Sequence, residues 1–174
     1  MRGDLALQLR VALRPRGVVG VGGAFAGLAG VIAVYLPWYA LHADVTMLGS
    51  VRSRAVAALT GWQAHPWVWL VAALGVVATI VGLSVAADRP IPASPEILFA
   101  AAIAMSLTTG ASALVLPPTS RFGADEQLVQ LASLADAVPD DVSLGFSVHH
   151  ASGVWVALAA AALLLVTAFT SRRL

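Results

Sequence analysis

Histidine is the residue type in this chain with the clearest capacity for chemistry, because imidazole titrates near pH 7 and binds Zn²⁺ or Cu²⁺. The four histidines are His42, His65, His149 and His150. Each lies at the end of an apolar segment, so folding could bring them together, with Asp44 as a carboxylate neighbour. No H-x-x-x-H or H-E-x-x-H spacing orients them in advance. Ordinary hydrogen bonding is therefore the favoured interpretation, with a metal site or a pH-sensitive contact as alternatives.

Other catalytic and cofactor patterns are missing from the sequence. There is no nucleophile elbow, no phosphate-binding loop and no Glu/His pair with catalytic spacing. The chain has no Cys, which removes disulfide, thiol-redox and Cys–metal chemistry. A net charge of +1 gives no support for nucleic-acid binding. We predict a protein that is not an enzyme and needs no cofactor.

Four apolar segments long enough to cross a hydrocarbon core would position the histidines. They are residues 17–38, 66–87, 96–116 and 151–170, and none has a charged residue or His in its interior. The chain has 174 residues, of which 59% are hydrophobic and 11% charged. A chain of this length has too few residues to surround four such helices with a soluble shell. The sequence predicts an integral membrane protein with a four-helix bundle.

The arginines predict the orientation of these helices, since the chain has no Lys. Seven Arg residues would share one side of the membrane, namely Arg2, Arg10, Arg14, Arg16, Arg89, Arg172 and Arg173. Arg52, Arg54 and Arg121 lie on the other side. The positive-inside rule then puts both termini in the cytoplasm of a multi-pass plasma-membrane protein. Segment 1–16 is expected to lie on the inner leaflet, with 17–174 as a single membrane domain.

The outer loops, residues 39–65 and 117–150, carry signals of further structure. Residues 45–48 read as a strand, and residues 51–59 fit a second strand or a short helix. In the other loop, residues 125–138 have an apolar face typical of an amphipathic helix. Residues 142–148 alternate between apolar and small polar side chains, which is the clearest strand pattern in the chain. We expect the two loops to pair their strands in a small extracytoplasmic cap of short strands and one amphipathic helix.

The tryptophans lie on the same predicted side as the histidines. They are Trp38, Trp62, Trp67, Trp69 and Trp155. Aromatic belts normally mark both membrane surfaces, and the inner side has no Trp. We therefore expect these side chains to pack inside the cap, with Trp38 and Trp62 at its corners. A direct contact with a partner is the alternative.

Small residues on the helices indicate close helix packing. Gly23 and Gly27 on the first helix, like Ala78 and Gly82 on the second, have the small-xxx-small spacing. Packing within the chain is favoured over contact with another protein. The third helix has a polar patch formed by the hydroxyl side chains of Ser106, Thr108, Thr109 and Ser112. We interpret this patch as a site of hydrogen bonding between helices in preference to a substrate path.

Two short motifs after the first helix resemble motifs of known membrane-protein families. Leu36-Pro37-Trp38-Tyr39 is followed by Gly61-Trp62 just before the second helix. With four helices and a strand-bearing outer loop, the chain resembles claudin-type proteins and actinobacterial four-helix membrane proteins of the tryptophan-associated type. The Cys pair of claudin loops is missing. The resemblance implies a cap architecture and no activity.

The favoured function is an accessory or structural subunit of a larger plasma-membrane complex. It would contact protein partners through its outer cap and its small-residue helix faces, and membrane lipids elsewhere. The alternative is a small membrane protein that binds a metal or a lipid between the cap and the bundle.

Overall fold

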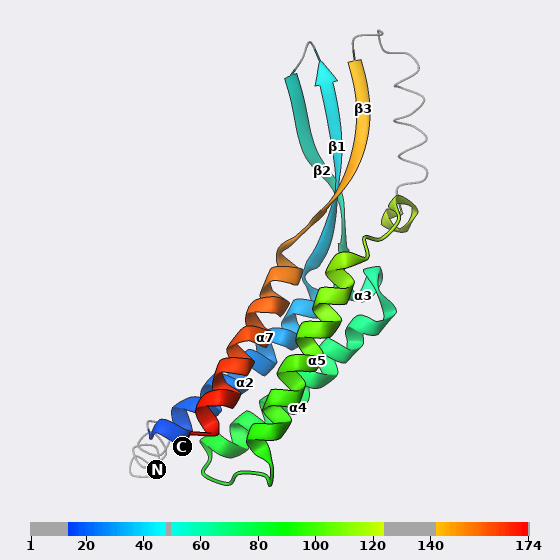
Figure 1. Cartoon of the computed structure of the whole chain (residues 1–174). Coiled ribbons are helices and arrows are strands. Elements are labelled where there is room, and N and C mark those ends of the chain that lie inside the picture. The colour runs from blue at the N-terminus through cyan, green and yellow to red at the C-terminus, as the bar shows by residue number, and fades with distance from the viewer. Residues whose placement is uncertain (1–13, 48–49, 124–141, 174) are drawn as a thin grey trace, which may run out of the picture.

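The computed structural model describes residues 14–47, 50–123 and 142–173, which form a helical bundle and a small sheet (Figure 1). The helical elements are α2 (Pro15–Tyr35), α3 (Gly61–Ala64), η1 (Pro66–Val68), α4 (Trp69–Ala86), α5 (Ser94–Leu114), η2 (Thr119–Phe122) and α7 (Ser152–Ser171). The strands are β1 (Pro37–Met47), β2 (Ser50–Thr60) and β3 (Val142–His150). The amphipathic helix predicted at residues 125–138 and most of the segment 1–16 lie outside the described residues.

Four helices are long and apolar enough to cross a membrane, as the sequence predicted. They span Pro15–Tyr35, Pro66–Ala86, Ser94–Leu114 and Ser152–Ser171. The first ends earlier than expected, because Leu36 is already extended and Pro37 begins a strand. A proline disfavours helical backbone at the preceding residue, so the Leu-Pro pair explains this boundary.

The start of α5 also differs from the prediction. The helix begins two residues before the predicted segment, and Ala93 is its N-cap residue, with a left-handed φ of 61°. Ser94 is the first helical residue, and its hydroxyl donates a hydrogen bond back to the carbonyl of Ile91. The turn before α5 is therefore closed by a side chain inside the helix.

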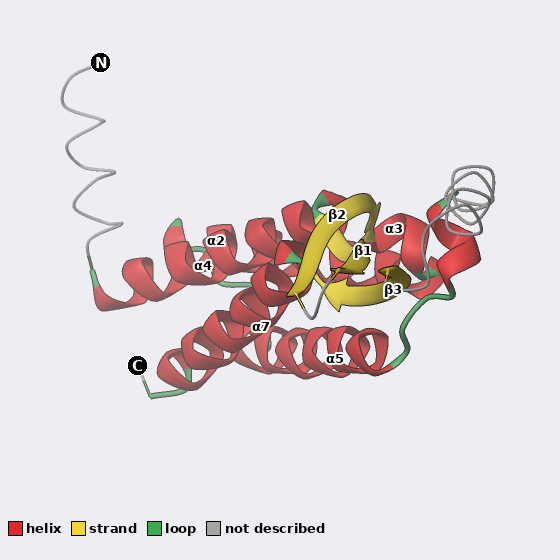
Figure 2. Ribbon diagram, turned by 90° about the horizontal axis from the view of Figure 1, so that it is seen from above, coloured by secondary structure: helices red, strands yellow, loops and turns green. Residues whose placement is uncertain are grey.

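The bundle is a ring in which each long helix packs on two others. The pairs in contact are α2 with α4, α4 with α5, α5 with α7 and α7 with α2, and the pair α2 and α4 has the most extensive contact (Figure 2). This contact depends on glycine. A Cβ on Gly20 would lie 2.4 Å from the backbone nitrogen of Ala86, and one on Gly27 would lie 2.5 Å from the carbonyl oxygen of Gly75.

The predicted small-residue motif is therefore half correct. Gly27 is a close-approach position, whereas a Cβ on Gly23 would meet nothing nearer than 3.7 Å. Gly20 is the second tight position of α2, one heptad before Gly27. Gly23 and Gly27 are both buried, so this face is used within the chain, as the favoured interpretation predicted.

The three strands form one sheet in the order β2-β1-β3, with both pairs antiparallel. This confirms that both long loops, residues 39–65 and 117–150, contribute to a sheet and that their strands pair. Residues 51–59, for which the sequence fitted either a strand or a short helix, lie in the strand β2. The sheet projects away from the bundle, on the opposite side from the start of α2 and the end of α7 (Figure 1). We call these two ends of the molecule the sheet end and the terminal end.

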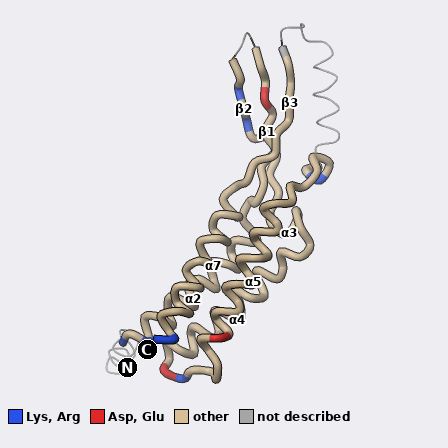
Figure 3. The backbone as a smooth tube through the Cα atoms, in the orientation of Figure 1, with Lys and Arg blue, Asp and Glu red and all other residues tan. Residues whose placement is uncertain are grey.

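Charged residues lie towards the two ends of the molecule in the described chain, and the stretches of the long helices between those ends have none (Figure 3). Within the described residues, the terminal end has five Arg against two acids: Arg14, Arg16, Arg89, Arg172, Arg173, Asp88 and Glu96. At the sheet end the described charged residues are Arg52, Arg54, Arg121 and Asp44.

Candidate functional site

Trp38 anchors the sheet to the bundle. It is fully buried at an irregularity of β1, where Pro37 pairs with Thr60 and Tyr39 pairs with Leu59. Its indole Nε1 donates a 2.7 Å hydrogen bond to the carbonyl oxygen of Ala33, in the last turn of α2. The same carbonyl accepts a 3.2 Å hydrogen bond from the backbone N–H of Leu36, so Trp38 adds a second donor at the end of α2.

Two glycines make room for the Trp38 ring. A Cβ on Gly61 would lie 2.7 Å from it, and a Cβ on Gly153 would lie 2.3 Å from it. The indole thus fills a slot between the start of α3 and the start of α7. In the Gly61-Trp62 motif, glycine is the residue that the fold requires, while the Trp62 ring is exposed.

A buried polar network lies next to Trp38. The Tyr39 hydroxyl donates to the carbonyl oxygen of Ser112 and lies 3.1 Å from Nε2 of His65. Since the single hydroxyl proton goes to the carbonyl, neutral His65 donates to the Tyr39 oxygen. Trp67 stacks on His65, with ring centroids 4.7 Å apart, and its Nε1 donates to the Ser112 hydroxyl at 3.0 Å.

This network caps the end of α5. The His150 ring lies beside Tyr39, and its Nε2 is 2.9 Å from the carbonyl oxygen of Ala113. Tyr39 and His150 therefore bond two successive carbonyls in the last turn of α5, and the Ser112 carbonyl also accepts from the backbone N–H of Val115 at 3.3 Å. Arg121 on η2 similarly donates to the carbonyl oxygen of Ala64, at the end of α3. Side chains from the strands and short helices thus close the sheet end of the bundle.

Burial sets the protonation of this network. Desolvation raises the pKa of Tyr39 to about 12. Desolvation also lowers the pKa of His65, and the charge of Arg121 lowers it further. Both groups are therefore neutral at pH 7, and their arrangement is that of a structural hydrogen-bond network.

A second polar cluster lies on the exposed face of the sheet. The His42 and His149 rings are 4.8 Å apart between centroids. Nδ1 of His42 lies 3.1 Å from the Ser53 hydroxyl, and Nε2 of His149 lies 3.0 Å from the Ser147 hydroxyl. Ser147 donates to Asp44 at 2.7 Å. The hydrogen bonds from Ser147 and then Ser53 lower the pKa of Asp44, so its carboxylate is ionised at neutral pH.

The structure thus divides the four histidines into two pairs. His65 and His150 contact Tyr39, and His42 and His149 contact each other. Across the described residues, no group of three or more His, Asp or Glu side chains is close enough to hold a metal ion. A site with all four imidazoles is not formed in the described structure.

The five tryptophans also divide into two groups, one buried and four exposed. Only Trp38 is buried, so the expectation that the set packs inside the cap is wrong for the other four. Trp62, Trp67, Trp69 and Trp155 are between 42 and 63% exposed. They lie on α3, η1 and the first turns of α4 and α7, which places them around the sheet end of the bundle. Indole rings at one level of a helix bundle are typical of a membrane interface.

The hydroxyl groups of the polar patch on α5 form hydrogen bonds mainly with carbonyls of the same helix. The hydroxyls of Ser106 and Ser112 donate to the carbonyls of Ala102 and Thr108. Only Ser112 also reaches another element, through Trp67. The buried Thr109 hydroxyl has no hydrogen-bond partner among the described residues. The contribution of the patch to tertiary structure is therefore concentrated at Ser112.

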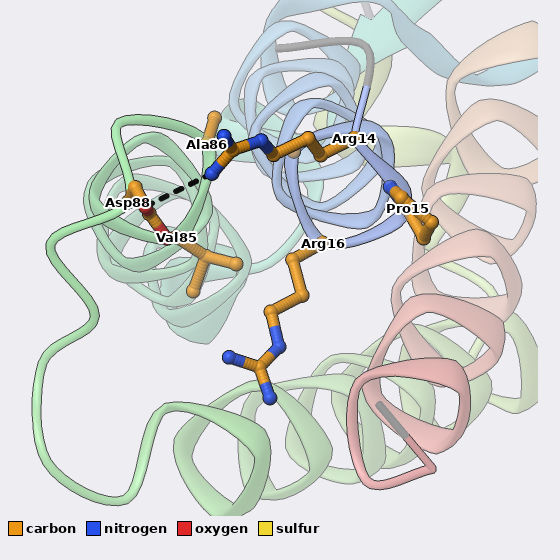
Figure 4. Close-up of a pocket in the computed structure, with 7 residues that line it drawn as sticks. Arg14, Pro15, Arg16, Val85, Ala86 and Asp88 are labelled. Carbon is orange, nitrogen blue, oxygen red and sulfur yellow. Dashed lines mark ion pairs between the residues drawn. The ribbon is translucent and has the colours of Figure 1, made fainter. Parts of the chain in front are cut away.

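Cavities occur at the terminal end. One of about 420 Å³ is lined by Arg14, Arg16, Asp88 and the end of α4, and a neighbouring one of about 310 Å³ reaches Ser94 and Glu96 on α5. Nη1 of Arg14 points to Oδ2 of Asp88 at 3.8 Å, while the Arg16 side chain points away from that pair (Figure 4). Exposed charges surround both cavities.

Sequence reasoning missed the roles of Tyr39, Ser112 and Gly153. Tyr39 was noted only as part of the motif after the first helix, although a Tyr beside a buried Trp commonly needs a partner for its hydroxyl. Gly153 is the second residue of α7, and a small residue on an apolar helix often indicates close packing. Their shared location at the sheet end becomes visible only when the helices are assembled.

Comparison with protein-family models and with curated proteins finds no match. The functional argument therefore depends on the geometry of this chain, and the likeness to claudin-type and actinobacterial four-helix proteins stays a prediction.

Proposed function

We propose that the chain is a non-enzymatic accessory subunit of a larger plasma-membrane complex, and that it contacts its partner along strand β2. The observation that carries this proposal is the exposure of that strand. Every residue from Ser50 to Val56 is exposed, including Val51 at 65% and Val56. Exposed apolar residues on a strand of 11 residues are a common feature of protein-binding surfaces.

The backbone of β2 supports the same proposal. β2 is an edge strand, since it pairs with β1 on one side and with no described strand on the other. An open edge presents N–H and C=O groups that another strand can pair with. Arg52 and Arg54 on this strand are exposed and would favour an acidic partner segment.

The four exposed tryptophans and the terminal-end arginines support a membrane orientation. Tryptophans at the sheet end fit the outer interface, and five described Arg at the terminal end fit the cytoplasmic one. In this orientation the chain crosses the plasma membrane four times, both termini are cytoplasmic, and the sheet stands outside. Lipids contact the apolar outer faces of the helices.

The proposal no longer uses the glycine face of α2. Gly20 and Gly27 are occupied by α4, and Gly23 is buried, so that face is closed to a partner. The alternative function, a metal or lipid held between the cap and the bundle, has less support. Trp38, Tyr39 and Leu41 fill the junction of sheet and bundle and are fully buried, and the two cavities described above lie at the other end.

Site-specific photo-cross-linking in native membranes tests the proposal. A photoreactive amino acid replaces Val51 on β2, and a matched variant carries it at Ile91, an exposed apolar residue at the terminal end. We expect irradiation of the Val51 variant to give one adduct of defined mass that contains a second protein. The Ile91 variant is expected not to form that adduct.

Two results would contradict the proposal. One is a Val51 variant that gives no protein adduct while gentle detergent extraction yields a solitary monomer. The other is an adduct made only of two copies of this chain, which would indicate a homodimer in place of a subunit of a larger complex.

A further inference from the structure

The two histidines on the exposed face of the sheet are arranged differently from the other two. β3 pairs with β1 so that Ser147 lies opposite His42 and His149 lies opposite Ala40. His42 and His149 are therefore diagonal neighbours on one face, close enough for their side chains to meet. Their ring centroids are 4.8 Å apart, with a 49° angle between the ring planes.

One carboxylate sets the tautomer of His149. Asp44 accepts a 2.7 Å hydrogen bond from the Ser147 hydroxyl. Since the single hydroxyl proton of Ser147 goes to Asp44, its oxygen accepts from His149, which therefore has its proton on Nε2. Nδ1 of His42 lies 3.1 Å from the Ser53 hydroxyl, and we assign the proton of His42 to that nitrogen as well.

The opposite nitrogens then carry the lone pairs. These are Nε2 of His42 and Nδ1 of His149, and no hydrogen bond from the described part of the chain engages either atom. An imidazole whose second nitrogen donates to an oxygen is the usual form of a metal-binding histidine. The serines and Asp44 therefore provide the outer hydrogen bonds that such a ligand needs.

The ring separation also fits one ion. For one ion bound to both lone-pair nitrogens at metal–nitrogen distances near 2.1 Å, the metal would lie about 3.2 Å from each ring centroid, and the 4.8 Å separation would correspond to an N–metal–N angle of about 97°. That angle is close to the cis angle of tetragonal Cu²⁺ and somewhat below the tetrahedral angle of Zn²⁺. Cu²⁺ also binds nitrogen ligands more tightly than the other divalent ions of its row.

We propose that His42 and His149 form a two-imidazole site for a divalent transition-metal ion, with Cu²⁺ preferred to Zn²⁺, on the face of the sheet that bears Asp44. Water molecules complete the coordination. Both ligands lie on β1 and β3, so metal binding does not require a partner along β2, although Ser53 belongs to that strand.

The test is Cu²⁺ titration of the full-length, tag-free protein in detergent, followed by electron paramagnetic resonance and by competition with a chelator of known affinity. We expect one ion per chain, with hyperfine splitting from two nitrogens. His42→Ala and His149→Ala should each abolish this stoichiometric binding. Ser53→Ala and Ser147→Ala keep both ligands but should weaken binding by about tenfold, because they remove an orienting hydrogen bond.

His150→Gln is the matched control, because His150 adjoins His149 in the chain but contacts Tyr39 and Ala113. It should bind Cu²⁺ as the parent protein does. Circular dichroism of each variant separates loss of the site from loss of the fold. Absence of stoichiometric binding by the folded parent, or binding that persists in folded His42→Ala and His149→Ala variants, would overturn the proposal.

Discussion

At the sheet end, Tyr39, His65 and Ser112 are buried, and Tyr39 is hydrogen-bonded to the other two. At the terminal end, by contrast, Arg14 and Asp88 form an ion pair at 3.8 Å, and their side chains are 67% and 59% exposed. Buried polar groups are costly to leave unpaired, while an exposed ion pair contributes at most about 1 kcal/mol. The difference shows that the sheet is fixed to the bundle by specific contacts. The terminal end carries a layer of solvated charge, as expected next to lipid headgroups.

The largest test of this difference is the Trp38→Ala substitution. Removing a fully buried indole should lower the free energy of unfolding by about 3–5 kcal/mol, because it leaves a cavity between Gly61 and Gly153. Thermal or denaturant unfolding in detergent measures the effect. Trp155→Ala, at an exposed ring, should change stability by only about 0.5 kcal/mol. Equal effects of the two substitutions would show that Trp38 does not anchor the sheet.

Substitutions of glycine in α2 test whether the helices at the terminal end are tightly packed, in addition to being surrounded by solvated charge. Gly20→Ala places a methyl group 2.4 Å from the backbone of Ala86 and should destabilise the protein by about 1–3 kcal/mol. Gly23→Ala, one turn along the same helix, meets nothing nearer than 3.7 Å and should be close to neutral. If both are neutral in unfolding measurements, the terminal end is loosely packed as well as solvated.

The hydrogen-bond network can be tested by removing one oxygen. Tyr39→Phe leaves the Ser112 carbonyl and His65 without their shared partner and should lower the free energy of unfolding by about 1–3 kcal/mol. Tyr35→Phe is the control, since Tyr35 is exposed on the adjacent helix end. A loss no greater than that of the control would mean that water replaces the hydroxyl without cost.

The pH dependence of stability gives the smallest expected effect. The pKa of His65 is lower in the folded chain than the usual value near 6.5, so the unfolded chain takes up a proton at a higher pH. Stability should therefore fall as the pH drops below about 6.5. Unfolding midpoints measured from pH 7.5 to 5 should show this slope, and His65→Gln should reduce it. An unchanged slope would assign the effect to other groups.

The four spans and the strand β3 could be predicted from local patterns, whereas residues 51–59 were left open between a strand and a helix. Hydropathy identified four segments that match the four long helices, and the alternation at residues 142–148 identified β3. These patterns are strong because burial or lipid contact acts on every residue of the element. Helix ends were predicted less well, since Leu36 and Ala93 adopt backbone conformations set by the neighbouring proline and turn.

The candidate site was harder to predict because it depends on contacts between distant residues. The sequence grouped His149 with His150, but neighbouring residues of a strand point to opposite faces of a sheet, and the structure separates them. The role of Ser112 was hidden in the same way, since its partners Trp67 and Tyr39 are 45 and 73 positions away. Sequence reasoning also expected all the tryptophans to behave alike, although only Trp38 has glycines beside it that make room for its ring.

We propose that the sheet end faces outward and that the terminal end faces the cytoplasm. Because the chain has no Cys, single substitutions give clean sites for a membrane-impermeant maleimide. In intact cells, we expect the reagent to label a Val51→Cys variant and to label an Ile91→Cys variant only after the membrane is permeabilised. Labelling of Ile91→Cys but not Val51→Cys in intact cells would contradict the orientation and the proposed outward contact along β2.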